Sequence, residues 1–253
     1  MRHAHLETLL GPDDLPPVEI WHGAGRRPVL LCCDHASRTV PRALNGLGLA
    51  PALLARHIGW DIGAAALTRA LSRRLDAPAL LSGYSRLVID CNRYPDDPSS
   101  IPLASDQVVI PGNQGLEPVA REARLAAIFH PYHAAIARLI ERCPVLVSIH
   151  SFTPVMNGVE RPWAMGVLWD EDPRIAVPLL EALRLNSAHV IGDNQPYSAR
   201  DPKGYTVHHH AARRGLPHVA LEFNQKLIAD EAAAAAWAAI TADALEPILA
   251  RLK

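Results

Sequence analysis

Apolar residues gather in short blocks that predict buried strands. Residues 144–154, PVLVSIHSFTP, form a near-continuous apolar run between two prolines, and this pattern is typical of a short strand buried on both faces. Residues 94–116 contain four prolines and two glycines with little apolar periodicity, so we expect a long loop there. The other predicted strands are residues 28–33, 78–83, 86–90, 164–169, 188–191 and 217–223.

The stretches between these strands repeat their apolar residues at intervals of about 3.6, which predicts amphipathic helices. Gly59 and Gly63 should bend the first helix around Asp61, and Pro131 should kink the second. Because strands and helices alternate, we expect an α/β fold with three α/β/α layers, in which helices cover both faces of a mostly parallel or mixed sheet. The predicted helices are residues 53–75, 117–142, 173–185, 208–214 and 230–252.

The length of 253 residues suits one α/β domain with a large core. We expect a single catalytic domain over residues 1–253, in which residues 1–27 form an irregular arm rich in proline and glycine. The four cysteines should be reduced core residues, and Cys32 and Cys33 should point to opposite faces of a strand. The longest apolar stretches are broken within about ten residues, too few to cross a bilayer, and no signal peptide is visible, so we expect a cytoplasmic protein.

The charge of the chain narrows the class of partner. With 25 basic and 26 acidic residues the formal net charge is −1, which gives no electrostatic footprint for nucleic acid or for an anionic membrane. We expect a small neutral or acidic molecule as the ligand. The oligomeric state stays open.

Polar side chains stand at the ends of three predicted strands. His150 ends the strand 144–154, His35 follows the strand 28–33, and Glu222 lies near the end of 217–223. In open α/β sheets, ligands bind beyond the carboxyl ends of the strands. A single histidine there would more often bond to a neighbouring loop, but two imidazoles and a carboxylate indicate a metal-assisted hydrolase.

Hydrolysis of an amide at neutral pH fits a zinc ion held by three protein ligands, because the ion lowers the pKa of its water to about 7 and stabilises an oxyanion. We expect His35 and His150 to be two of the ligands. Asp61 is the predicted third ligand, although an Asp before a helix is also a preferred N-cap. Asp34 and His57 are the reserve candidates.

Glu222 is the predicted general base, because partial burial would raise its pKa toward the useful range. A salt bridge to an arginine or to Lys226 is the alternative interpretation. A second polar group flanks the predicted strand 86–90, and we expect Arg86 to assist the oxyanion. Asn92 and Arg93 should bind a substrate carboxylate, since a guanidinium holds a carboxylate bidentately and an amide adds a directional hydrogen bond.

In order along the chain, these motifs resemble the N-formylglutamate amidohydrolase family. The resemblance covers nearly all of residues 28–240, and its two most specific motifs are SRLVIDCNR and SIHSFTP. The HxxE metal motif of carboxypeptidases is absent, because Arg38 stands three residues after His35. The matching motifs are DHAS at 34–37, WDIGA at 60–64, SRLVIDCNR at 85–93, SIHSFTP at 148–154, DNQPY at 193–197 and LEFNQ at 221–225.

The resemblance implies a zinc-dependent hydrolase with the phosphorylase/hydrolase-like fold of zinc carboxypeptidases and aspartoacylases. Its implied reaction is the cleavage of N-formyl-L-glutamate to formate and L-glutamate, the last step of one route of histidine degradation. Ser37, Tyr197, Tyr205 and His209 are expected to line the substrate pocket. Of the run 208–210 only one histidine should face the site, because consecutive residues of a helix point about 100° apart.

Two other functions stay open from the sequence. One is a binding protein with the same carboxylate pocket but no catalytic metal. Another is thiol catalysis by Cys32, Cys33 or Cys91, which we disfavour because burial in apolar strands raises the pKa of a thiol. Related zinc deacylases or carboxypeptidase-like hydrolases that act on another N-acyl amino acid are the alternatives within the same class.

Overall fold

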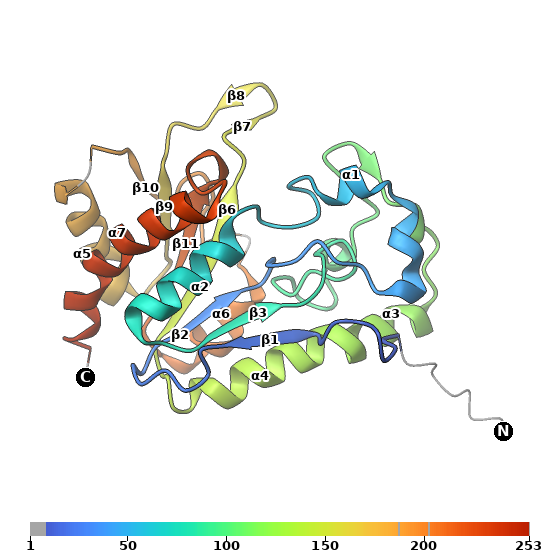
Figure 1. Ribbon diagram of the computed structural model, residues 1–253, viewed down its shortest axis with the longest axis horizontal. Helices are drawn as coiled ribbons and strands as arrows, with labels where there is room; N and C mark the ends of the chain where they lie inside the picture. Colours follow the sequence, from blue (N-terminus) through green and yellow to red (C-terminus); the bar gives the residue numbers. More distant parts are fainter. Residues whose placement is uncertain (1–8, 187, 202, 253) are drawn as a thin grey trace.

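The structure is a computed structural model that describes residues 9–186, 188–201 and 203–252. Its centre is a seven-stranded mixed sheet (Figure 1). The strands of this sheet form from the predicted apolar runs, except at one edge. In spatial order they are β1 (Val18–Trp21), β3 (Ala79–Ser82), β2 (Leu30–Cys33), β6 (Leu146–Phe152), β11 (His218–Asn224), β9 (Met165–Leu168) and β10 (Ile191–Asp193).

The four strands β3, β2, β6 and β11 run parallel to one another in the middle of the sheet. β1 pairs antiparallel to β3, and β9 pairs antiparallel to β11. From β2 the chain first goes to β3 on one side and then returns to β6 on the other side. The sheet therefore has a topological switch point between the carboxyl ends of β2 and β6, which is where ligands bind in open α/β sheets.

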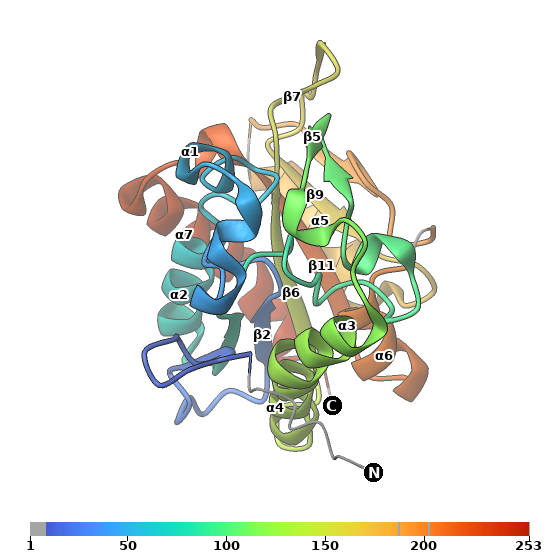
Figure 2. The same cartoon turned by 90° about the vertical axis from the view of Figure 1, so that its right-hand side faces the viewer.

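Helices cover both faces of the sheet (Figure 2). One face packs against α2, α5 and α7, and the other packs against α4. Cys33 belongs to the first core and Cys32 to the second, which confirms that the two side chains point apart. The described helices are α1 (Pro51–Leu54), α2 (Ala64–Leu75), α3 (Pro118–Arg124), α4 (His130–Ile140), α5 (Pro173–Asn186), α6 (Tyr205–His210) and α7 (Glu231–Leu249).

This arrangement confirms the predicted three-layer α/β/α fold with a mixed sheet. The helix α7 is long and apolar enough to cross a membrane by length and composition alone, unlike the interrupted apolar stretches that we expected. Its apolar character comes largely from alanines, and one side of it packs against α2 and α5. A core helix of this kind passes the same test, so it is weak evidence for a membrane span.

Four local predictions differ from the structure. Residues 86–90 form a turn and extended loop rather than a strand, because the chain leaves the sheet after β3 and their apolar side chains pack into the second core. The predicted irregular arm contains the edge strand β1, while residues 1–8 of the arm lie outside the described part of the chain. A π-helical turn at Leu125–Phe129 separates α3 from α4, just before Pro131. Two small hairpins also form, β4 (Ala104–Ser105) with β5 (Val108–Val109) and β7 (Val155–Met156) with β8 (Val159–Glu160).

Candidate metal centre and active site

Two imidazoles meet at the switch point of the sheet. His35 is the second residue after β2, and His150 lies near the end of the neighbouring strand β6. Their ring centroids are 5.0 Å apart, and the two residues are only 3% and 4% exposed. The apolar strands thus bury both rings and bring their δ1 nitrogens to one point.

The carboxylate of Asp61 lies at that point. Its Oδ2 atom is 3.3 Å from His35 Nδ1 and 2.9 Å from His150 Nδ1. One donor atom from each of the three residues lies within 4.8 Å of the others. Zinc–nitrogen bonds are about 2.0 to 2.1 Å long, so two histidines can share one ion only if their nitrogens lie close together. The donor atoms of His35 and His150 meet this condition.

Local backbone geometry explains how Asp61 reaches the strands. Its amide N–H donates to the His35 carbonyl over 2.9 Å, so the loop before α2 lies against the end of β2. Gly63 then turns the chain into α2 with a φ of 82°, and a Cβ there would lie 2.1 Å from the carbonyl oxygen of Ile228. Asp61 does not cap α2, because that helix begins at Ala64 and has no side-chain cap.

A second carboxylate holds the outer nitrogen of each imidazole. Asp90 Oδ1 lies 2.7 Å from His35 Nε2, and Asp34 Oδ2 lies 3.3 Å from His150 Nε2. Asp34 is fixed in turn by the hydroxyl groups of Tyr132 and Thr206, each of which donates to its Oδ1 over 2.8 Å. Carboxylates in this position orient metal-binding histidines and leave the opposite nitrogen free to bind the ion.

The acidic surroundings shift the pKa values of both imidazoles. Burial and Arg86 lower the pKa of His35, but the carboxylates of Asp90 and Asp61 outweigh them and the net pKa is raised. For His150, burial also lowers the pKa, but the hydrogen bonds that Asp34 and Asp61 accept from its ring raise it well above its usual value. The same carboxylates favour any cation that binds between the two rings.

The donor set fits zinc. Two imidazole nitrogens and one carboxylate oxygen are ligands that Zn²⁺ takes in catalytic sites, where a fourth position stays open for water or substrate. His35, Asp61 and His150 are all buried, and their opposite atoms are held by protein groups. His57 is not part of this group of three, and its Nε2 lies 3.6 Å from Asp106 instead.

Glu222 lies on β11 directly beside His150, since the two residues are partners in the parallel register of β11 and β6. It is 8% exposed, and its Oε2 atom is buried without a hydrogen-bond partner among the described residues. Burial raises the pKa of this carboxyl to about 7. No salt bridge from Glu222 to an arginine or to Lys226 occurs in the described part of the chain.

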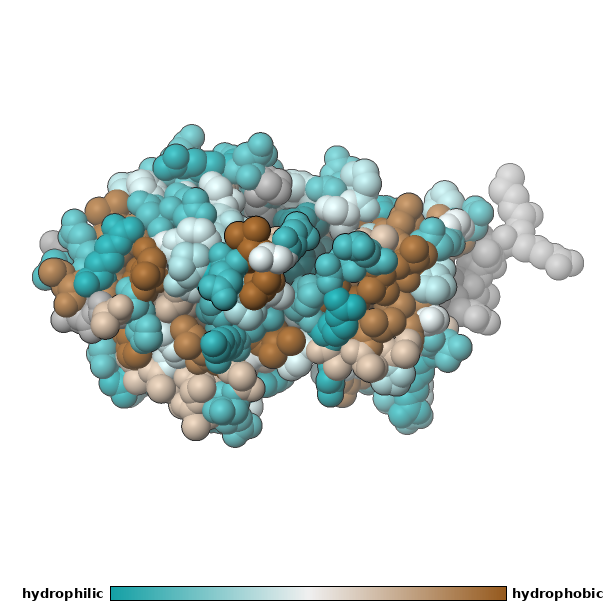
Figure 3. Space-filling model, turned by 90° about the horizontal axis from the view of Figure 1, so that it is seen from above, coloured by the Kyte–Doolittle hydropathy of each residue, from teal (hydrophilic) through white to brown (hydrophobic). Residues whose placement is uncertain are grey.

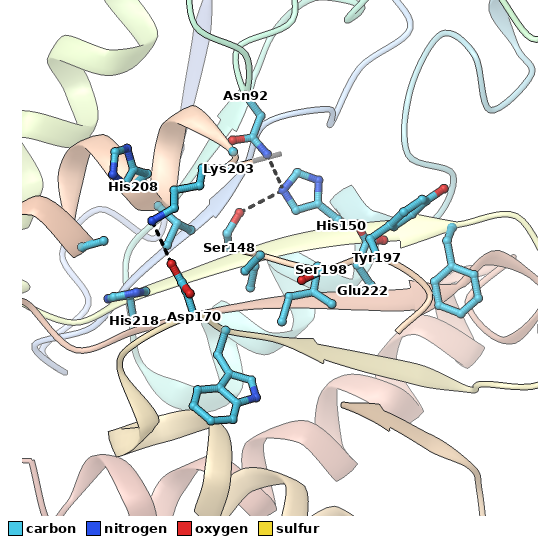
Figure 4. A pocket seen from close by; sticks show the side chains of 18 of the residues that line it. Asn92, Ser148, His150, Asp170, Tyr197, Ser198, Lys203, His208, His218 and Glu222 are labelled. Carbon is cyan, nitrogen blue, oxygen red and sulfur yellow. Dashed lines mark hydrogen bonds and ion pairs between the residues drawn. The ribbon is translucent and has the colours of Figure 1, made fainter. Parts of the chain in front are cut away.

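The predicted polar group of Arg86, Asn92 and Arg93 lines the same cavity as Glu222. Arg86 bonds to Asp90 Oδ2 over 2.7 Å, and its Nη1 is 3.5 Å from Asp61 Oδ1. Asn92 Nδ2 lies 3.5 Å from His150 Nε2 (Figure 4). Arg93 also lines the cavity, and its guanidinium donates to the carbonyl oxygen of Asn92 over 3.2 Å.

These groups line one cavity of about 1060 Å³. Figure 3, the view onto the carboxyl ends of the central strands, shows a hollow with hydrophilic side chains around it. Tyr197 lines the cavity and is one of the predicted pocket residues, and Figure 4 shows it on the Glu222 side of the site. Its hydroxyl accepts from Arg161 Nη1 over 3.0 Å.

Three predicted pocket residues are not among those that line the cavity. The hydroxyl of Ser37 accepts from the Thr39 N–H over 3.1 Å and so serves a local turn. Tyr205 packs into an aromatic cluster, and His209 stacks on it at a centroid distance of 4.6 Å. The face of α6 that meets the cavity carries His208 instead, as Figure 4 shows.

The sequence did not reveal which groups hold His35 and Asp34 in place. Asp90 belongs to the polar group predicted around residues 86–90, but the sequence did not identify it as the partner of His35, although a carboxylate between Ile89 and Cys91 indicates a buried charge that needs a partner. Thr206 and Tyr132 gave no signal of their own, because their partner Asp34 is distant in sequence by 172 and 98 positions.

Comparison with known proteins gives a consistent result. The sequence profile of a protein family described as N-formylglutamate amidohydrolase matches residues 27–229. A solved gene product of Agrobacterium tumefaciens is 35% identical, with 96% of this chain and 98% of that chain covered and a TM-score of 0.91. The N-formylglutamate amidohydrolase of Ralstonia eutropha JMP134 is 17% identical, with 94% and 100% covered and a TM-score of 0.68, which shows the fold alone. No curated protein matches the sequence.

Proposed function

The chain belongs to the N-formylglutamate amidohydrolase family and is a hydrolase that acts on an amide bond, and on this premise we propose that it cleaves N-formyl-L-glutamate to formate and L-glutamate with the help of one zinc ion. The observation that carries the proposal is the convergence of His35, Asp61 and His150 beside the unpartnered carboxyl of Glu222. As part of the same proposal, the reaction belongs to histidine degradation in the cytoplasm.

In this proposal His35, Asp61 and His150 hold the metal. A zinc ion bound there would supply a water of lowered pKa and a positive charge for the developing oxyanion. Asp90 and Asp34 hold the outer nitrogens of the two imidazoles, so that each ring presents its δ1 nitrogen to the site.

In this proposal Glu222 transfers the proton from water to the leaving nitrogen. A carboxyl with a pKa of about 7 is matched to a reaction at neutral pH, because it can take a proton from water and later release it at a similar cost. Its Oε2 atom has no competing partner among the described residues. Glu222 therefore accepts the proton from the attacking water and delivers it to the amide nitrogen that leaves.

Arg86 and Arg93 have different roles in this proposal. Arg86 is fixed by Asp90 and reaches toward Asp61, so it stands beside the proposed metal and can stabilise the oxyanion. Arg93 and Asn92 bind the α-carboxylate of the substrate. Arg93→Ala should therefore raise KM by an amount equivalent to about 2 to 3 kcal/mol, the size of a hydrogen bond between charged groups, with a smaller change in kcat. An unchanged KM would remove Arg93 from the substrate site.

Direct assay tests the function. The purified protein is incubated with N-formyl, N-acetyl and N-carbamoyl amino acids, with added zinc and after treatment with a chelator, and the released acid and amino acid are measured. We expect N-formyl-L-glutamate to be hydrolysed by the zinc-loaded protein and not after metal removal. Full activity without bound metal would refute the metal assignment, and hydrolysis of none of these amides would refute the proposed function.

A further inference from the structure

The cavity does not end at the catalytic groups. It continues along one face of the sheet, from Glu222 to His218 on the same strand. These residues are four positions apart, and at about 3.3 Å per residue the cavity follows β11 for roughly 13 Å. We call this extension the groove, and it is lined by Ser148, Leu168, Val207, Ala212, His218 and Ala220.

The floor of the groove follows from strand alternation. His218, Ala220 and Glu222 share one face of β11 because side chains alternate along a strand. In the sheet, Ala220 pairs with Ser148 of β6 and with Leu168 of β9. The small side chain at position 220 keeps the middle of the floor open, and Val207 and Ala212 form the facing wall.

The proposed carboxylate site is connected to this groove. Asn92, which the proposed function assigns to the α-carboxylate, accepts from the Thr206 N–H at the start of α6 over 3.1 Å. The carboxylate clamp is therefore attached to the helix whose residue Val207 lines the groove. His57 and Thr153 line another part of the same cavity, which leaves room there for the acyl group.

The far end of the groove is polar, and two of its cationic side chains are paired with carboxylates of the protein. Lys203 lies 2.8 Å from Asp170, a pair that Figure 4 shows at this end, and Arg174 lies 2.7 Å from Asp172. The exposed residues Glu171, Asp201 and Arg213 also line the cavity and bring both signs of charge. A ligand group that ends here meets four carboxylates and three cationic side chains, which do not form a pocket for an anion.

Two imidazoles at the same end can hydrogen-bond to a ligand. His218 Nδ1 donates to the carbonyl oxygen of Leu216 over 2.8 Å, which leaves its Nε2 as an acceptor. The hydroxyl of Tyr94 bonds to His208 Nδ1, so Nε2 of that ring is the atom left to bond to a ligand. A neutral group that both donates and accepts hydrogen bonds complements this pair.

We propose that the groove binds the side chain of the leaving amino acid and accepts side chains longer than that of glutamate that end in a neutral polar group, such as a carboxamide or ureido group. The inference rests on the proposed function, because it uses the position of the scissile amide. A glutamate side chain extends only roughly 5 Å beyond its Cα by standard bond lengths. It would leave much of the roughly 13 Å of the groove unfilled.

A series of N-formyl-L-amino acids tests the length and the end group. The zinc-loaded protein is assayed with the N-formyl derivatives of alanine, glutamate, glutamine and citrulline. We expect kcat/KM to rise from alanine to glutamine and from glutamine to citrulline, by about tenfold or more over the series. The glutamate derivative should be hydrolysed less efficiently than the glutamine derivative of the same length.

Two variants block the groove from opposite sides. Ala220→Leu fills the floor and Ala212→Leu fills the facing wall, while Ala236→Leu on the exposed side of α7 is the matched control. Each blocking variant should lose about tenfold or more in kcat/KM with the citrulline derivative. Activity with the alanine derivative should stay near that of the control, which separates a blocked groove from a damaged catalytic site.

The outcomes are distinguishable. Equal kcat/KM for the alanine and citrulline derivatives, or equal losses with both in the two blocking variants, would overturn the groove as a side-chain subsite while the proposed function stands. A preference for glutamate over glutamine would overturn the neutral end group. If the zinc-loaded protein hydrolyses no N-formyl amino acid, the proposed function fails and this inference fails with it.

Discussion

Among the described residues, two pairs of histidines are buried side by side, and only one of these pairs is suited to bind a metal. His35 and His150 are 3% and 4% exposed, and His133 and His210 are 6% and 4% exposed. The centroid distances are 5.0 Å in the first pair and 5.2 Å in the second. The two pairs are therefore similar in burial and in the distance between their rings, and they differ in the groups that surround them.

Asp34, Asp61 and Asp90 contact the rings of the first pair and Glu222 lies beside it, whereas aromatic rings surround the second pair. His133 packs 4.3 Å from Phe129 and 4.6 Å from Tyr205 between ring centroids. His133 Nε2 donates to the carbonyl oxygen of Cys91 over 2.8 Å, and its Nδ1 lies 3.0 Å from His210 Nε2. The described hydrogen bonds of this second pair thus involve no carboxylate. The two nitrogens that face each other, His133 Nδ1 and His210 Nε2, are occupied by their mutual hydrogen bond.

The pKa values respond to this difference. Burial lowers the pKa of His133 to about 4 and that of His210 to about 3, while the carboxylates raise the values of His35 and His150. The comparison teaches that a pair of buried imidazoles becomes a metal site through its acidic partners. The first pair should bind a cation, and the second should only support the packing of α4 against α6.

Removing one ring from each pair gives the largest expected contrast. His150→Ala should lose its bound zinc and about a thousandfold or more in kcat/KM, since a bound ion contributes several kcal/mol to stabilising the transition state. His210→Gln is the matched control and should keep both, because an amide can still donate to His133. The measurements are metal content by elemental analysis and hydrolysis of N-formyl-L-glutamate. Full zinc occupancy in His150→Ala would count against the ligand assignment.

Substitution of Glu222, the carboxyl beside the first pair, should give the next largest loss of activity. Glu222→Gln keeps the size of the side chain but removes the base, so kcat should fall by about 10² to 10⁴, the usual contribution of general acid–base catalysis. Zinc should stay bound, because the three ligands are untouched. The exposed Glu160→Gln is the control and should behave like the unaltered protein. Undiminished turnover in Glu222→Gln would assign the base elsewhere.

Asp90, which bonds to the outer nitrogen of His35, allows a direct test of whether acidic partners make a histidine pair a metal site. Asp90→Asn preserves shape but removes the charge that orients the ring and fixes Arg86. We expect zinc affinity to fall by about 10- to 100-fold, the usual cost of losing such a partner, as measured by competition with a chelator. Asp96→Asn, an exposed carboxylate six positions away, should leave the affinity unchanged. Equal affinities in the two variants would show that acidic partners do not define the site.

Local sequence patterns predicted most of the fold and the three groups at the strand ends, but not their partners. The apolar runs place β2, β6 and β11 in the interior, and polar residues within or directly after them mark His35, His150 and Glu222. Residues 86–90 were predicted wrongly because an apolar run has the same composition whether it joins a sheet or packs over a core.

The missed and misplaced side chains depend on contacts that are distant in sequence. Thr206 and Tyr132 meet at Asp34 only because α6 and α4 lie over the same part of the sheet. His208 rather than His209 faces the cavity because the rotation of the short helix α6 is set by how Tyr205 packs against Phe129. A rotation of this kind leaves no trace in hydrophobic periodicity over six residues.

The second pair of histidines gives the smallest effect, on stability rather than activity. The folded state keeps His133 neutral down to a pKa of about 4, whereas an unfolded histidine takes up a proton near pH 6.5. Stability is therefore fully present above pH 6.5 and is lost as the pH falls toward 4, because the unfolded state binds the proton first. His133→Gln should be less sensitive to acid by about 2 kcal/mol at pH 5. Urea unfolding at pH 7.5 and pH 5 measures this, and an equal loss of stability in both proteins would show that the ring is already charged in the folded state.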